Sequence, residues 1–141
     1  MKTVISIQDG ELWYGGAVGL GDLYPLDKDS NFEEDFRVNQ TPNQLNPVFF
    51  SSHGRYFWME ESGKVTFRKG TIEVEAESIE LVDAGATLKD ASLAASRKHY
   101  PPTGTTPDRR AFLGPQYCSW VVLLWNQNQE SLLEYARGIV R

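Results

Sequence analysis

Hydrophobic and polar residues alternate most regularly between positions 48 and 82. Apolar side chains recur at every second position, as in Val65 and Phe67 or Ile72 and Val74, which is the period of a strand with one buried face. The pattern predicts strands separated by short turns, at 48–51, 55–59, 65–67, 71–76 and 79–82. Turns at this spacing are typical of an antiparallel meander that forms half of a β-sandwich, so we expect a mainly β fold. The aromatic run at 56–58 favours a central position for its strand.

Two further strand patterns precede this region. Residues 4–7 and 12–14 are expected to be strands joined by a turn, in which Asp9-Gly10 is a strong hairpin signal. Glycine is then frequent from Gly15 to Gly21, and one interpretation is a phosphate-cradling loop. Because Tyr24-Pro25 follows instead of a helix, we favour a bent strand end at which two backbones approach closely.

Residues 22–47 predict a long loop rich in proline, asparagine and acidic side chains. A loop of this length inside a compact domain is either functional or poorly ordered. Its acids are candidates for calcium ligands, but they lack the regular alternation of an EF-hand loop, so we interpret them as solvated surface charge. They are Asp27, Asp29, Glu33, Glu34 and Asp35.

The hydrophobic period becomes helical after Thr87. Thr87 and Asp90 have the spacing of a capping box, and we expect the helix to end near His99, before Tyr100-Pro101. We therefore place a β-sandwich domain that ends in a short helix at residues 1–100. A turn-rich linker is expected at 101–115.

The densest apolar run lies at 116–125 and predicts a strand buried on both faces, as in a parallel sheet. A helix with Asn128 as its N-cap is expected to follow, from Gln129 to Val140. Its apolar stripe, which we expect to be buried, consists of Leu132, Leu133, Tyr135, Ala136, Ile139 and Val140. A strand followed by a helix is the beginning of a parallel βα unit, which we place at 116–141. Such a strand needs a neighbouring strand, and no later segment of the sequence supplies one.

The composition is that of an ordinary soluble globular protein, with 141 residues of which 40% are hydrophobic and 23% charged. A net charge of −5 argues against a surface for nucleic acid or for an anionic membrane. No apolar run approaches the roughly 20 residues of a membrane span, and no signal peptide is visible. The compartment, cytoplasmic or periplasmic, is left open.

Few residues are candidates for catalysis or metal binding. His53 and His99 lack partners at a useful spacing, so we expect both to be structural or surface residues. Cys118 is the single cysteine, which excludes an internal disulfide and a cysteine-based zinc site. Its apolar surroundings predict a core residue and not a nucleophile. We expect no catalytic residue, no metal site and no cofactor in this chain.

A family resemblance covers nearly the whole chain. Residues 87–137 resemble the segment that joins the N-terminal domain of family 31 glycoside hydrolases to their catalytic barrel, and two upstream segments are similar to that N-terminal domain. The matching residues are Leu88–Ser96, Tyr100–Gly104, Pro107-Asp108, Pro115–Tyr117, Ser119-Trp120 and Asn126–Glu130, with Trp13–Val18 and Ser51–Trp58 upstream. The similarity is strongest to bacterial members of the α-glucosidase type.

This resemblance implies a galactose-mutarotase-like β-sandwich packed on a (β/α)8 barrel, with 116–141 as the first βα unit of that barrel. The two carboxyl groups that cleave a glycosidic bond would lie on later barrel strands, so the chain alone is expected to be inactive. It also implies candidate substrate-binding residues on a loop of the sandwich and at the first barrel strand. They are Asp22, Tyr24, Trp120 and Trp125.

The end of the expected barrel strand departs from the family pattern. Cys118 and Ser119 stand where the resemblance implies Asn and Thr, and Val122 stands where it implies a Glu that accepts hydrogen bonds from a sugar. Ordinary substrate contact at this strand is therefore not expected. For Trp120 and Trp125, packing in a core is favoured over stacking on a sugar ring.

Two functions remain open at the level of sequence. The first is an N-terminal accessory domain of a glycoside hydrolase acting on α-glycosidic bonds, which would contact carbohydrate in a full-length enzyme. The second is a free-standing β-sandwich module that binds carbohydrate or protein. Because 116–141 would expose much apolar surface, we also expect it to pack on the sandwich or to mediate a homo-oligomer. Neither nucleic acid nor a membrane is expected as a partner.

Overall fold

A computed structural model describes residues 1–38 and 43–140. The chain divides into two compact units, of which the first ends at Pro102 and the second begins at Thr103. Position 141, and the part of the expected 22–47 loop at 39–42, lie outside the described residues.

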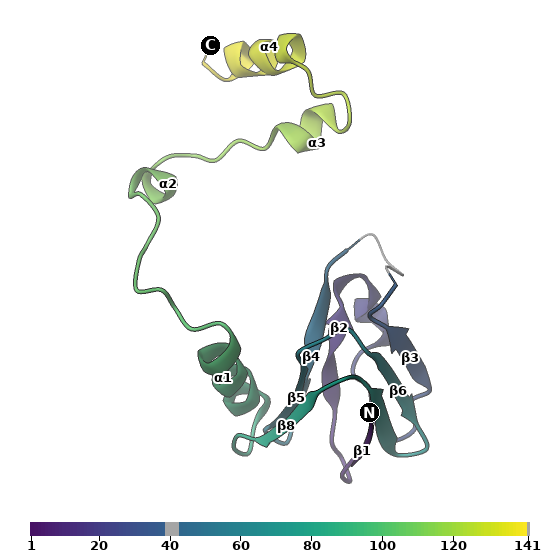
Figure 1. Cartoon of the computed structure of the whole chain (residues 1–141). Helices are drawn as coiled ribbons and strands as arrows, with labels where there is room; N and C mark the ends of the chain where they lie inside the picture. Colours follow the sequence, from purple (N-terminus) through teal and green to yellow (C-terminus); the bar gives the residue numbers. More distant parts are fainter. Residues whose placement is uncertain (39–42, 141) are drawn as a thin grey trace. The chain divides into compact units, whose positions relative to one another are not determined.

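The first unit is a β-sandwich of two antiparallel sheets with four strands each (Figure 1). Sheet A has the order β1 (Lys2–Ser6), β7 (Thr71–Glu75), β6 (Lys64–Arg68) and β3 (Phe32–Asp35). Sheet B has the order β2 (Trp13–Ala17), β4 (Leu45–Ser51), β5 (Arg55–Met59) and β8 (Ile79–Asp83). This confirms the mainly β fold and the central position of the aromatic strand β5.

The main core lies between the two sheets and is built by the predicted alternation. Val65 and Phe67 of sheet A and Phe57 of sheet B are fully buried in it. Phe49 and Phe57 stack with ring centroids 5.0 Å apart. Such a core supplies the main stabilising term of the domain, because each buried aromatic or aliphatic side chain contributes about 1.5–3 kcal/mol.

A second apolar cluster covers the outer face of sheet B. Helix α1 (Leu88–His99) packs there with Ala91 and Ala95 buried against Val48 and Tyr56. Thr87 and Asp90 form the predicted capping box, so both ends of the expected helix are confirmed. Sheet B is thus apolar on both faces, which explains why successive residues of β5 are aromatic.

The strand pairing differs from the predicted meander. The strands at 4–7 and 12–14 do not form a hairpin, because β1 pairs with β7 in sheet A and β2 pairs with β4 in sheet B. The region 48–82 is likewise divided, since β4, β5 and β8 belong to sheet B whereas β6 and β7 form a hairpin in sheet A. Alternation identifies which residues face inward, but both sheets bury one face against the same core, so it does not assign a strand to a sheet.

The glycine-rich region is the bent strand end that its composition favoured. The register of β2 and β4 shifts between Gly15 and Gly16, and a short 3₁₀ segment, η1 (Val18–Leu23), follows. A Cβ atom on Gly15 would collide with the backbone of Val48 and Phe49 in β4. This close approach accounts for glycine at the bulge.

The expected 22–47 loop contains a strand that sequence reasoning missed. β3 pairs with β6, which places Phe32 opposite Phe67 and Glu34 opposite Val65. Glu33 is exposed as predicted, but Glu34 is fully buried, so the interpretation of this acid as solvated charge is wrong. Phe32 and Glu34 share the inward face of the strand because side chains alternate.

The second unit is helical. It contains α2 (Arg110–Leu113), α3 (Ser119–Leu123) and α4 (Gln129–Ile139). The predicted helix from Gln129 is confirmed, and the Asn128 side chain caps it by accepting from the Ser131 amide at 3.0 Å. The predicted strand at 116–125 is wrong, since α3 occupies its centre. A strand without a paired neighbour leaves its backbone unsatisfied, whereas a helical turn pairs locally.

Among the residues of the second unit that the structure describes, no side chain is buried. None of the residues of α3 or α4 is classed as buried, so the expected burial of the α4 stripe is not observed in this unit. Cys118 is exposed, which corrects its assignment to a core. In the part of the chain that the structure describes, no helix has the length and apolar character needed to span a bilayer.

Candidate functional site

The first pair of predicted sugar contacts lies on one short segment of the sandwich. Asp22 belongs to η1 and is exposed, and Tyr24 is the residue that ends it. Val18 and Leu23 of the same segment are also exposed. An exposed carboxylate between apolar side chains suits hydrogen bonding to a hydroxyl-rich ligand with an apolar ring face.

Tyr24 is turned toward the interior and not toward solvent. Its ring lies 6.2 Å from that of Phe32, and its hydroxyl is buried without a hydrogen-bond partner among the described residues. Burial, with a smaller effect of the Glu34 charge, raises the pKa of Tyr24 to about 12. The phenol is therefore neutral at physiological pH, and its position favours a role in holding η1 over direct contact with a ligand.

The second pair of predicted contacts lies in the second unit. Trp120 and Trp125 face each other at 88°, with ring centroids 4.6 Å apart. Trp120 is 43% exposed and Trp125 is 89% exposed. The expectation that they pack in a core is therefore not met within this unit. Two exposed indole rings at right angles form an apolar surface available to a partner.

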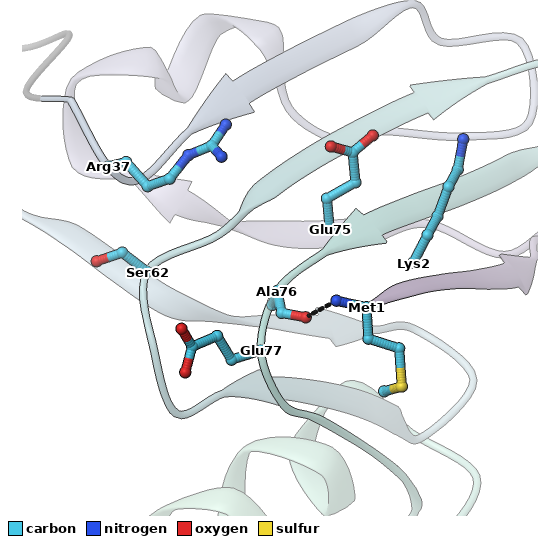
Figure 2. Close-up of a pocket in the computed structure, with 7 residues that line it drawn as sticks. All are labelled: Met1, Lys2, Arg37, Ser62, Glu75, Ala76 and Glu77. Carbon is cyan, nitrogen blue, oxygen red and sulfur yellow. Dashed lines mark hydrogen bonds between the residues drawn. The ribbon is translucent and has the colours of Figure 1, made fainter.

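A hollow lies at one end of sheet A (Figure 2). It is lined by Met1, Lys2, Arg37, Ser62, Glu75, Ala76 and Glu77. The terminal ammonium of Met1 donates to the Ala76 carbonyl at 2.8 Å, and Lys2 pairs with Glu73. Cationic and acidic groups both line it, and none of the predicted contact residues is among them.

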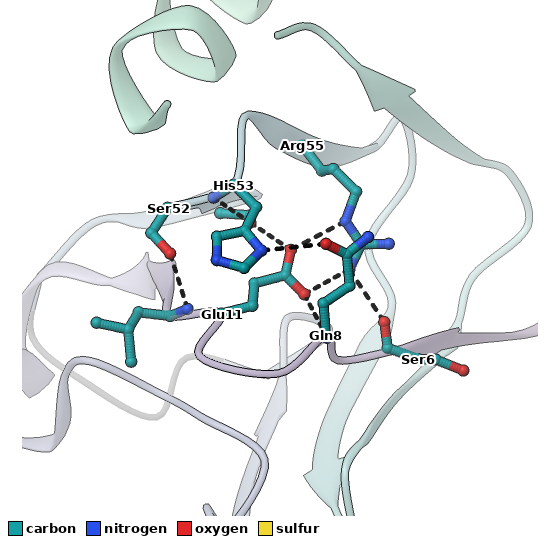
Figure 3. A network of polar contacts seen from close by, with 8 residues as sticks. Ser6, Gln8, Glu11, Ser52, His53 and Arg55 are labelled. Carbon is teal, nitrogen blue, oxygen red and sulfur yellow. Dashed lines mark hydrogen bonds and ion pairs between the residues drawn. The ribbon is translucent and has the colours of Figure 1, made fainter. Parts of the chain in front are cut away.

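A buried polar network joins the β1–β2 connection to the β4–β5 turn (Figure 3). Glu11 is fully buried and accepts hydrogen bonds from the Arg55 guanidinium, the Gln8 amide and the Ser51 hydroxyl. Arg55 also donates to the Ser6 carbonyl at 3.0 Å, and its guanidinium lies over the Trp13 ring. Because the charges satisfy each other, the network is suited to structure and not to proton transfer.

His53 and His99 have the structural or surface positions expected of them. His53 Nδ1 lies 3.0 Å from the Gln8 side-chain oxygen, beside this network. His99 ends α1 and stacks on Trp58, with ring centroids 4.1 Å apart. In the described residues, no group of three or more His, Cys, Asp or Glu side chains is placed to hold a metal ion.

Glu34 is the polar residue of greatest interest that sequence reasoning missed. It is buried in the main core, and one of its carboxyl oxygens has no hydrogen-bond partner among the described residues. Burial raises the pKa of its carboxyl group, against the opposing effect of a hydrogen bond from the Ala17 amide. The flanking Phe32 and Phe36, each two positions away, were the available signal that Glu34 faces inward.

The chain matches no family model and no curated protein.

Proposed function

We propose that the chain is the N-terminal accessory β-sandwich of a glycoside hydrolase of the family 31 type, acting on α-glycosidic bonds, together with the beginning of its catalytic domain. The chain would supply no catalytic residue of its own. Its sandwich would support the enzyme, and η1 with Asp22 would border the sugar site. The motifs quoted for the resemblance, from Leu88 to Glu130, are one support for this proposal.

The observation that carries the proposal is the exposed apolar surface of the second unit. Val121, Trp125 and Leu133 are all exposed, although their sequence pattern is that of a buried βα unit. Apolar patches of this kind on soluble proteins usually mark a surface that another domain covers. A catalytic barrel is the domain that the resemblance implies for this position.

A reconstitution experiment tests the proposal. The catalytic barrel of a family 31 α-glucosidase, prepared without its N-terminal domain and first βα unit, is mixed with the full chain. We expect a stable complex on size-exclusion chromatography and hydrolysis of an aryl α-glucoside that neither part shows alone. A Leu133→Asp variant, with its charge on the apolar side of α4, should reduce both, whereas the polar Arg137→Gln variant should not. The absence of both a complex and hydrolysis would contradict the proposal.

The exposed tryptophan pair favours a second candidate function, a free-standing module that binds carbohydrate. Indole rings stack on the apolar faces of sugar rings, and Trp125 is accessible for this. Calorimetric titration of the full chain with α-linked gluco-oligosaccharides separates the two functions. Saturable binding that is lost in Trp125→Ala supports the module, and absence of binding excludes it.

A further inference from the structure

The turn between β1 and β2 exposes an aspartate that is followed by glycine. Asp9 precedes Gly10, and no other aspartate or asparagine in the sequence precedes a glycine. The Asp9 side chain is 94% exposed, and Gly10 is exposed as well. Gly10 has a φ of +71°, and no atom lies within 4 Å of the position that a Cβ would take. Both residues of the pair are therefore accessible and uncrowded.

An aspartate–glycine pair can isomerise because glycine has no side chain to hinder its nitrogen. The Gly10 nitrogen attacks the side-chain carboxyl carbon of Asp9. A C–N bond forms, the carboxyl hydroxyl and the amide proton leave as water, and a five-membered succinimide ring closes. Solvent water then adds at the main-chain carbonyl of the ring and breaks its bond to the nitrogen. The product is isoaspartate, in which the chain runs through the former side chain.

The amide of Gly10 is free to react. In the part of the chain that the structure describes, it donates no hydrogen bond, whereas the amides of Gln8 and Glu11 both do. Asp9 Oδ1 accepts from Lys28 Nζ at 3.0 Å, and this hydrogen bond lowers the pKa of the Asp9 carboxyl group. The ring closes from the protonated carboxyl group, because a carboxylate has a poorer leaving group. The ion pair with Lys28 therefore slows the reaction.

The same turn positions Glu11 of the buried network (Figure 3). The Glu11 amide donates to the Gln8 carbonyl at 3.2 Å, and the Gln8 amide donates to Glu11 Oε2 at 2.9 Å. Both hydrogen bonds span Asp9 and Gly10. Isoaspartate adds one carbon atom to the main chain between Gln8 and Glu11. This lengthens the turn and displaces Glu11 from Gln8 and from its ion-pair partner Arg55.

We propose that Asp9 is a site of spontaneous isomerisation, through a succinimide closed by the Gly10 nitrogen, and that the isoaspartyl product loosens the buried Glu11–Arg55 network. A covalent change at an exposed turn would thereby reach the interior of the sandwich. This inference does not depend on the proposed function.

Prolonged warm incubation of the full chain at mildly acidic pH tests the site, with the peptide that contains Asp9 followed by chromatography and mass spectrometry. We expect a species lighter by one water, and then an isomer of unchanged mass whose fragmentation identifies isoaspartate. Asp9→Glu keeps the charge but would need a six-membered ring, which closes far more slowly, so it should give neither. Lys28→Gln should form the succinimide faster, because the Asp9 carboxyl group is then protonated more often.

Hydrogen exchange on the separated isoaspartyl chain tests the effect on the network. The Gln8 and Glu11 amides should exchange roughly tenfold faster than in the fresh chain, as expected when such hydrogen bonds are lost. Asp9→Ala cannot isomerise and removes only the exposed ion pair, so it should exchange as the fresh chain does. The proposal is overturned if position 9 stays aspartate throughout incubation, or if the isoaspartyl chain protects both amides normally. Equal rates of ring closure with and without Lys28 would overturn the role of that ion pair.

Discussion

The Glu11 carboxylate and the Arg55 guanidinium form a bidentate ion pair inside the sandwich. Arg55 Nε donates to one carboxylate oxygen at 2.9 Å, and Nη2 donates to the other. The Glu11 side chain is fully buried and that of Arg55 is 14% exposed. Fork-like pairing satisfies both charges at once, which is the arrangement that makes a buried ion pair tolerable. The pair ties the β1–β2 connection, which crosses between the sheets, to β5.

Removal of one partner should therefore be costly. Glu11→Ala leaves the Arg55 guanidinium beside an apolar core without a counter-charge, and we expect the free energy of unfolding to fall by about 3 kcal/mol. Urea denaturation followed by tryptophan fluorescence measures the change. Asp9→Ala is the matched control, since Asp9 pairs with Lys28 on the surface, and it should have little effect. Equal losses in both variants would show that burial of the pair is unimportant.

The same pair gives the stability a defined dependence on pH. Burial acts to raise the pKa of the Glu11 carboxyl group, but hydrogen bonds from Arg55, Gln8 and Ser51 outweigh it and hold the pKa below its usual value of 4.5. The stabilisation is therefore present above that value and is lost as pH falls through the lowered pKa of the folded state. The difference in unfolding free energy between the unmodified chain and Glu11→Gln should shrink on acidification below about pH 4.5. A difference that does not change with pH would contradict the assignment.

The capping box of α1 is a second target. The Thr87 hydroxyl accepts from the Asp90 amide at 3.3 Å, and the Asp90 carboxylate accepts from the Thr87 amide at 3.0 Å. Thr87→Ala should lower the free energy of unfolding by about 1 kcal/mol. Ser92→Ala, at an exposed interior position of the same helix, should be neutral or slightly stabilising because alanine has the higher helix propensity. Thermal unfolding followed by circular dichroism distinguishes these outcomes.

The stacking of Trp58 on His99 holds the end of α1 against sheet B. The rings are 4.1 Å apart and within 9° of parallel, and Tyr100 meets Trp58 edge-on. A double-mutant cycle of Trp58→Ala and His99→Ala should give a coupling energy of about 1 kcal/mol. The cycle of Trp58→Ala with Ser92→Ala should give a coupling near zero. Coupling absent from both cycles would mean that α1 docks without this contact.

The sequence predicted the local structure of the first unit well where one face is apolar. The alternation at Val65, Phe67, Ile72 and Val74 identified β6 and β7, and Thr87 located the start of α1. Sheet membership was not predictable in the same way. The Asp9-Gly10 turn has hairpin chemistry, but here it connects two sheets, because pairing is decided by contacts distant in sequence.

The candidate site was predictable only in part. Asp22 and Tyr24 do lie together at η1, but the burial of Glu34 was hidden by its place in the acidic run Glu33–Asp35. An acidic side chain is by default expected on the surface. The signal for burial is Phe32, two residues earlier, because it lies on the same face of the strand as Glu34. The prediction of a strand at 116–125 failed for the opposite reason. The apolar composition of this segment indicates burial, but composition alone does not identify the neighbouring strand that a strand needs for pairing.

The exposed apolar side chains of the second unit lead to a final prediction, that the isolated chain self-associates. Val121 and Trp125 are respectively 75% and 89% exposed, and such surface is usually covered by another molecule in solution. Sedimentation velocity over a wide concentration range should show reversible association, and Trp125→Ser should weaken it at least about tenfold by removing a large aromatic contact. Arg137→Ser, a polar change on α4, is the control and should not. Because association would be driven by the burial of apolar surface, it should persist at high salt. A chain that stays monomeric at every concentration while Trp125 remains accessible to a fluorescence quencher would contradict this prediction.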